Sequence, residues 1–262
     1  MIIHSFDSES PEIVRAAETI RPEEKALAAP FPIESVILVF SGRLIALLLE
    51  KGLIEPLAEG LSIGSAAFKN PIYHIKRTNI GVVLSGIGAP MAAAVVEELL
   101  TLFPVRRFLV FGSCGALVDL PEGRLIVPTA AYRDEGCSYH YAAPAPYITI
   151  RNADRLCSLL DALCVEYVRG KTWTTDAFYR ETEKNKARRV AEGCVCVEME
   201  CSALQAVCDF RGAELFQFVY AADSLHGNWS RRILGDLEND ARLQYFALAW
   251  ELAKLLENSD GA

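Results

Sequence analysis

The sequence predicts an α/β fold in which one central sheet is covered by helices on both faces. Short apolar runs typical of buried parallel strands recur along the chain, and segments with helical periodicity stand between them. Several of these runs end in glycine-containing or acidic segments, which is where open α/β sheets bind their ligands. The chain has 262 residues, a hydrophobic content of 52% and no low-complexity linker or internal repeat. These properties fit one domain that spans residues 1–262.

The elements are expected in the following order. Residues 1–34 carry polar and proline-containing stretches and should form an irregular lead-in with one short helix at residues 12–19. Apolar runs predict buried strands at residues 35–40, 80–84, 108–111, 125–129, 167–172, 194–197 and 215–221. Apolar residues at helical spacing predict helices at residues 44–53, 91–102, 154–163, 201–210 and 237–256. This alternation predicts a largely parallel sheet.

Composition and charge exclude several classes of partner. The formal net charge is −8 and the pI is near 5.2, so neither nucleic acid nor an anionic membrane is an expected partner. The chain shows no signal peptide and no apolar run long enough to span a membrane. Its eight cysteines include no C-x-x-C pair, and its four histidines show no metal-ligand spacing. We therefore expect a soluble, cytoplasmic protein with free thiols and no metal.

Two carboxylates stand at the end of one predicted strand. Glu198 and Glu200 follow the strand at residues 194–197 and precede a predicted helix. Ligands of α/β sheets bind outside the carboxyl ends of strands, and a carboxylate accepts hydrogen bonds from a vicinal diol such as the ribose 2′,3′ pair. The alternative is that both acids only suit the dipole of the helix that follows. The segment alone leaves both interpretations open.

Two glycine-containing segments are candidates for ligand-binding turns. Gly86 and Gly88 precede a helix, where backbone N–H groups can bind a phosphate, but Met91 replaces the third glycine of the dinucleotide fingerprint. Gly112-Ser113-Cys114-Gly115 follows another strand and predicts a turn whose amides and hydroxyl contact a ligand. A serine or cysteine nucleophile there would need a general base, and the sequence places no histidine to supply one. Packing is therefore the favoured role of Cys114.

An aromatic pair and a single acid follow two further strands. Phe178 and Tyr179 stand in a polar segment, where a ring can stack on a flat heterocycle for roughly 1–3 kcal/mol; the alternative is that Phe178 caps the core. Asp223 follows the strand at residues 215–221. A carboxylic acid there can protonate a purine base as it departs. The alternative role of Asp223 is the N-cap of the next segment.

Five segments in this order resemble the nucleoside phosphorylase family, which contains the hexameric purine nucleoside phosphorylases and the uridine phosphorylases. The resemblance runs from about Ser35 to Leu256, and the segments that carry it are residues 112–116, 134–141, 175–179, 197–200 and 222–224. It implies a single α/β domain with a mixed, barrel-like central sheet flanked by helices, in place of an open parallel sheet. It also implies a homo-oligomer, either a dimer or a hexamer, in which His4 reaches a neighbouring site; the alternative is an exposed terminal histidine.

The resemblance also implies a role for each candidate site residue. The substrate-binding set is Glu200 on the ribose hydroxyls, Met199 on the sugar, Phe178 on the base, Cys114 and Gly115 in the base pocket, Ser113 on phosphate or sugar, and Glu198 beside them. Asp223 resembles the catalytic general acid of the purine enzymes. Its basic partner is expected among His226, Arg231 and Arg232.

The residues that bind phosphate in this family are only partly present. The family's glycine-aspartate-proline turn with its following arginine is replaced here by Ser41-Gly42-Arg43, and Val110 stands where the family has a second arginine. The candidates for the cation lent by a neighbouring subunit are Lys69, Lys76 and Arg77. Arg43 and Ser113 are the remaining contacts, so phosphate should bind weakly, since each lost charge-assisted contact costs about 1.5–3 kcal/mol. Val110→Arg is expected to improve phosphate use.

These residues predict an enzyme that cleaves the N-glycosidic bond of a nucleoside, with a purine nucleoside favoured. Inorganic phosphate is the expected co-substrate, and no cofactor is expected. One alternative is a nucleosidase that uses water, which the missing arginines favour. A second alternative is a non-catalytic nucleoside-binding protein that has kept the base and ribose contacts.

Overall fold

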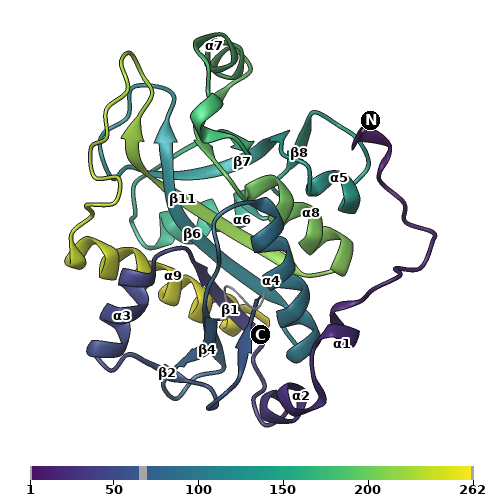
Figure 1. The fold of residues 1–262 in the computed structure, drawn as a ribbon. Helices are drawn as coiled ribbons and strands as arrows, with labels where there is room; N and C mark the ends of the chain where they lie inside the picture. Colours follow the sequence, from purple (N-terminus) through teal and green to yellow (C-terminus); the bar gives the residue numbers. More distant parts are fainter. Residues whose placement is uncertain (1, 65–69, 261–262) are drawn as a thin grey trace.

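One mixed sheet organises the chain (Figure 1). The structure is a computed structural model that describes residues 2–64 and 70–260, and within these ranges the sheet has eleven strands. The strands are β1 (Ser35–Val39), β2 (Ile54–Pro56), β3 (Ser62–Ile63), β4 (Asn70–Ile75), β5 (Ile80–Leu84), β6 (Arg107–Ala116), β7 (Leu125–Asp134), β8 (Tyr147–Thr149), β9 (Tyr167–Thr175), β10 (Cys194–Glu198) and β11 (Glu214–Ser224). The helices are η1 (Ile2–His4), α1 (Ala16–Thr19), α2 (Pro22–Ala28), α3 (Gly42–Glu50), α4 (Ala89–Leu102), α5 (Ser138–Tyr141), α6 (Ala153–Ala162), η2 (Phe178–Arg180), α7 (Glu183–Ala191), α8 (Cys201–Arg211) and α9 (Asn239–Asp260).

Five strands of this sheet close into a barrel. They pair in the order β6, β11, β7, β9 and β10, and β10 returns to pair antiparallel with β6. Small or branched side chains such as Cys114, Ala116, Val219 and Ala221 fill the interior. From β6 the sheet continues as an open arm through β1, β5, β4 and β2. The expected mixed, barrel-like sheet is confirmed, and the open, largely parallel sheet is wrong because β10 and β7 run antiparallel to their neighbours on one side.

Helices cover both faces of the open arm, as the alternation of elements predicts. The strands alternate their side chains between two cores: Val36 and Leu38 of β1 face α4 and α8, whereas Ile37 and Val39 belong to the core under α3, α6 and α9. Figure 1 shows α4 and α8 together on one side of the sheet and α3 beside α9 on the other. None of the helices in the described ranges combines the length and the apolar composition that crossing a bilayer requires.

The strands that form the barrel run further than their apolar runs predict. β6 continues to Ala116 and β11 to Ser224, so the predicted Gly112–Gly115 turn and the segment at Asp223 are parts of strands. Pairing between strands extends them, because the barrel satisfies their backbone groups even where the side chains are small or polar. The lead-in at residues 1–34 also holds a second helix, α2. Its first turn is capped by Glu24, whose carboxylate accepts from the backbone N–H of Arg21.

Candidate active site

Gly115 lies where the three strands that carry the candidate residues meet. In the sheet register, Gly115 of β6 is beside Asp223 of β11 and, on its other edge, beside Val197 of β10. A Cβ added at Gly115 would lie 2.5 Å from the side chain of Leu225 and 3.1 Å from that of Val197. Glycine at this position therefore allows β10 and β11 to approach β6. This close approach brings Asp223 near β10, the strand that leads into Glu198 and Glu200.

Asp223 is a buried acid that accepts a hydrogen bond from a neutral side chain. Trp229 donates from Nε1 to Oδ2 of Asp223 at 2.9 Å, and burial raises the pKa of the carboxyl above its ordinary value. Glu181, just after η2, has a pKa raised to about 7 by burial and by the charge of Asp223. Each of these two acids therefore keeps its proton to a higher pH than an exposed carboxyl does, which suits proton donation to a departing base.

The basic partner expected for Asp223 makes no direct hydrogen bond to it in the described chain. Arg232 donates instead to the carbonyl oxygen of Leu120 at 2.8 Å and acts on the pKa of Asp223 only through its charge. The direct contact comes from Trp229 because the chain folds back on itself: Ser224 and Ser230 exchange two backbone hydrogen bonds. The Gly227-Asn228 pair is the turn signal that would have indicated this reversal.

Glu198 uses both carboxylate oxygens inside the protein. Oε1 accepts from the hydroxyls of Thr172 and Thr174 at 3.2 and 2.6 Å, and Oε2 accepts from the backbone N–H groups of Glu200 and Cys201 at 2.7 and 2.6 Å. These bonds cap the first turn of α8 and fix the backbone of Glu200. The helix-capping interpretation therefore holds for Glu198, and the substrate contact expected from this residue stays a prediction.

Glu200 is oriented toward the predicted glycine loop. Its Oε1 accepts from the backbone N–H of Gly88 at 2.6 Å, at the start of α4. The side chain is buried, and burial together with the charge of Glu198 raises its pKa to about 8. The Gly88 amide that the sequence offers to a phosphate is thus occupied by Glu200. The contact joins the carboxyl end of β5 to the start of α8.

The raised pKa of Glu200 predicts a pH-dependent stability. Its pKa is about 8 in the folded protein and near 4.5 in an unfolded chain, so between these values the folded state holds a proton that the unfolded state has lost. The stabilisation is complete below about pH 4.5 and disappears as the pH rises through 8. We expect the free energy of unfolding of wild type, relative to Glu200→Gln, to fall over this interval in urea titrations. A constant difference at every pH would contradict the assignment.

Phe178 is exposed, whereas the thiol of Cys114 is buried. Phe178 is 49% exposed, and its ring contacts that of Tyr179 with centroids 4.0 Å apart, so it does not cap the core and remains accessible to a flat ligand. Cys114 faces the barrel interior, where its sulfur donates to the carbonyl oxygen of Tyr220 at 3.4 Å. Burial raises the pKa of this thiol well above its ordinary value. Cys114 therefore packs in the barrel interior, and its expected place in the base pocket stays a prediction. Met199 is half-buried beside Glu200.

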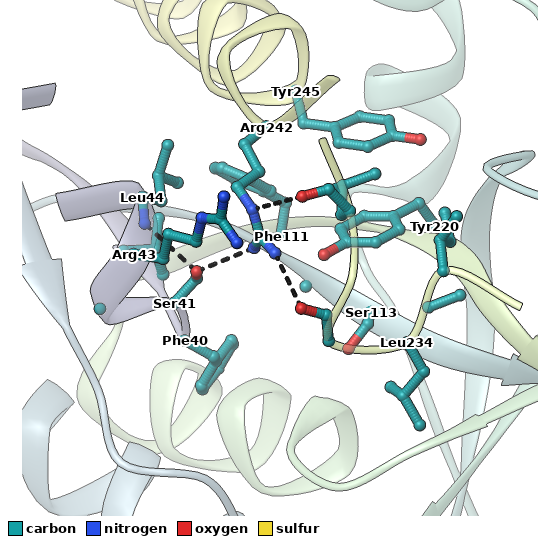
Figure 2. A pocket seen from close by; sticks show the side chains of 17 residues that line it. Phe40, Ser41, Arg43, Leu44, Phe111, Ser113, Tyr220, Leu234, Arg242 and Tyr245 are labelled. Carbon is teal, nitrogen blue, oxygen red and sulfur yellow. Dashed lines mark hydrogen bonds between the residues drawn. The ribbon is translucent and has the colours of Figure 1, made fainter. Parts of the chain in front are cut away.

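A cavity of about 390 Å³ opens beside Ser113 (Figure 2). It lies between the end of β1, the middle of β6 and β11, and the start of α9, and Phe111, Tyr220 and Tyr245 form aromatic walls. Figure 2 shows Arg242 extending from α9 toward Ser41, whose Oγ accepts from Arg242 Nη1 at 3.1 Å. Arg43 also lines the cavity, and its Nε donates to Asn239 at 3.1 Å. Sequence reasoning missed Arg242, which no motif marks.

Val110 is buried on the opposite side of β6 from this cavity. Its side chain belongs to the core under α4 and α8, whereas the next residue, Phe111, lines the cavity. Val110→Arg would therefore place a charge among packed side chains, and the expected gain in phosphate use is corrected to a loss of stability.

The remaining candidates lie at the surface. His4 is exposed in η1 together with Ile2 and Ile3. Lys76 is half-exposed and lies 3.9 Å from Glu55, and Arg77 is exposed in a turn with a positive φ. Lys69 lies outside the described residues.

Comparisons with known proteins agree with this architecture. The sequence profile of the phosphorylase superfamily matches residues 34–253. Among curated relatives, a "Purine nucleoside phosphorylase DeoD-type 1" of Shewanella oneidensis is 32% identical over 136 residues, which are 50% of this chain and 58% of that protein. A "Guanosine phosphorylase" of Halorubrum lacusprofundi is 32% identical over 139 residues, 52% of this chain and 57% of that protein. The chain thus matches less than two thirds of the length of these relatives.

Solved structures extend the likeness over most of the chain. An AMP nucleosidase from Bacteroides thetaiotaomicron has a TM-score of 0.71 at 16% identity and covers 94% of this chain and 100% of its own. A uridine phosphorylase from Vibrio fischeri has a TM-score of 0.65 at 24% identity and covers 87% and 94%. At such identities the likeness establishes the fold alone.

Proposed function

The chain belongs to the phosphorylase superfamily, and from this premise we propose that it cleaves the N-glycosidic bond of a nucleoside, preferentially a purine nucleoside, with inorganic phosphate as the attacking group. One observation carries the proposal: an acid with a raised pKa and an accessible hydroxyl at the edge of a cationic cavity flank the same short stretch of β6. These groups are Asp223, which lies against Gly115, and Ser113, which lines the cavity.

The spacing of these groups suits a sugar between them. Ser113 and Gly115 are two residues apart, so their side-chain positions share one face of β6 and are separated by roughly 7 Å. The Oδ1 atom of Asp223 would lie 3.4 Å from a Cβ at Gly115, which places the acid on that same face. An anion at Ser113 and a proton donor at Asp223 can therefore approach a ribose ring from its two sides.

The proposed reaction follows from these positions. An oxygen of phosphate attacks C1′ of the sugar while the C1′–N bond to the base breaks through an oxocarbenium-like state, and the bonding electrons pass to the base. Protonated Asp223 donates its proton to the base, at N7 in a purine, which makes the base a better leaving group. Glu200 holds the ribose hydroxyls, Phe178 stacks on the base, and the products are a sugar 1-phosphate and the free base.

A nucleosidase that uses water is the second candidate. The specific observation in its favour is Val110, which is apolar and buried where the family's phosphate arginine would stand. In this version Asp223 and Glu200 keep their roles, and the product is the free sugar.

The test is chromatography of a nucleoside panel incubated with the purified protein, with and without phosphate. We expect free purine together with a sugar 1-phosphate, and no turnover when phosphate is withheld. Equal turnover in both conditions, with the free sugar as product, would replace phosphorolysis with hydrolysis. Saturable nucleoside binding without turnover in either condition would make the protein a binding protein and contradict the proposed enzyme.

A further inference from the structure

Arg242 is a buried guanidinium whose described partners are all neutral. The residue is 8% exposed, and it donates to the carbonyl oxygens of Leu237 and Gly235 at 2.9 and 3.4 Å and to Ser41 Oγ at 3.1 Å. A guanidinium carries five N–H donors, of which these partners accept three. Burial of a charge is costly without a counter-charge, so this arrangement favours an anion within reach of the remaining donors.

The surroundings of Arg242 are selectively cationic. Although the chain has a net charge of −8, the cavity is lined by two arginines, Arg43 and Arg242, and none of the described residues that line it is acidic. Ser113 presents an exposed hydroxyl at the same cavity. A concave site lined by charges of one sign concentrates ions of the opposite sign.

Three separate elements converge on this space. Arg242 comes from α9, Ser113 from β6, and Ser41 caps the start of α3 by accepting from the N–H of Leu44 at 3.3 Å. The positive end of the α3 dipole therefore faces the cavity beside the guanidinium. Donors that approach from three directions fit a tetrahedral oxyanion, and the planar fork of an arginine suits two phosphate oxygens at once.

We infer that Arg242 is the principal cationic contact of a phosphate group in this cavity, in place of the arginine that is absent at Val110. The identity of this phosphate as the co-substrate rests on the proposed function, but the binding of a phosphate group at Arg242 does not. Arg242 lies 201 positions from Ser41 in the sequence. The presence of Arg242 in the cavity changes the expectation that phosphate binds weakly, because that expectation counts only the cations near the Ser41-Gly42-Arg43 turn. Inorganic phosphate and the phosphate of a nucleotide share this chemistry.

Isothermal titration of the full chain with inorganic phosphate, and separately with a nucleoside 5′-monophosphate, tests the inference without any turnover. We expect Arg242→Gln to weaken phosphate binding by about 10- to 150-fold. Arg242→Lys should fall between Arg242→Gln and wild type because it keeps the charge and loses the fork. Arg188→Gln, an exposed arginine on α7, is the matched control and should bind like wild type. If both ligands depend on Arg242, the monophosphate enters the cavity; if only inorganic phosphate does, the cavity takes the free anion.

Two results would overturn the inference: wild type that binds neither ligand, or Arg242→Gln that binds both as tightly as wild type. Circular dichroism checks that each variant folds, and Ser113→Ala, at an exposed hydroxyl, provides a second reading should Arg242→Gln fail to fold. Ser113→Ala should then weaken binding several-fold, and unchanged binding would count against the site. Phosphate binding without nucleoside cleavage would overturn the proposed function alone. Cleavage with an unchanged KM for phosphate in Arg242→Gln would overturn this inference alone.

Discussion

Asp223→Asn is expected to slow the cleavage of purine nucleosides by about 10²- to 10⁴-fold, the usual contribution of a general acid. Asparagine has nearly the same shape, and its amide oxygen can still accept the hydrogen bond that Trp229 donates to Asp223. What it lacks is a proton to give to the departing base. Because burial already raises the pKa of Asp223, the wild-type acid is prepared to hold that proton above the pH at which an exposed aspartic acid loses it. Steady-state kinetics on inosine or adenosine provide the measurement.

A substrate whose leaving group needs no proton gives the control for this prediction. On a nitrophenyl riboside, Asp223→Asn should retain most of the wild-type rate. An equal loss on both substrates would show that Asp223 supports the structure instead of donating a proton. Trp229→Phe offers a matched variant, because it removes one N–H that favours the ionised carboxylate. The pKa of Asp223 should then rise further, and the alkaline limb of the kcat/KM profile should move to higher pH.

Glu200→Gln is expected to lower kcat/KM by about 10- to 150-fold, since a charge-assisted hydrogen bond is worth roughly 1.5–3 kcal/mol. The glutamine amide replaces one acceptor oxygen with a donor and removes the negative charge, so its hydrogen bonds with the two ribose hydroxyls should be fewer and weaker. The pKa of about 8 adds a signature: the ionised fraction of Glu200 grows as the pH rises toward 8, and the kcat/KM of wild type should rise with it. Glu200→Gln should lose this acidic limb.

The competing explanation for Glu200 is structural, because its carboxylate accepts from the Gly88 amide and joins α4 to α8. That explanation predicts a lower free energy of unfolding with an unchanged KM for the nucleoside. Glu198→Gln is the comparison variant, since Glu198 is occupied entirely by hydrogen bonds within the protein. It should lose stability, whereas Glu200→Gln should lose turnover. Wild-type kinetics in Glu200→Gln would refute a ribose contact.

Local patterns determined most of the layered fold. The apolar runs at β1, β5 and β10 are continuous because these strands are buried on both faces, and the boundaries of β5 coincide with the predicted ones. Helical periodicity located α4, α6, α8 and α9 within a few residues. The edge strand β2 and its neighbour β4, together with α2 and α7, were not predicted, because their short or mixed patterns carry little periodic signal.

Among the candidate residues, the sequence determined which types follow which strands, and only the tertiary structure decided their roles. Glu198 and Glu200 stand one residue apart, but Glu198 ends β10 whereas Glu200 is the N-cap of α8 and has left the strand conformation, so Glu198 accepts from the start of α8 and Glu200 accepts from the Gly88 amide. The site residues Arg242 and Trp229 carry no motif. Arg242 reaches Ser41 because α9 packs against the end of β1, and Trp229 reaches Asp223 because the chain reverses after Ser224. Local spacing cannot encode such contacts, because they depend on which strands pair and which helix covers them.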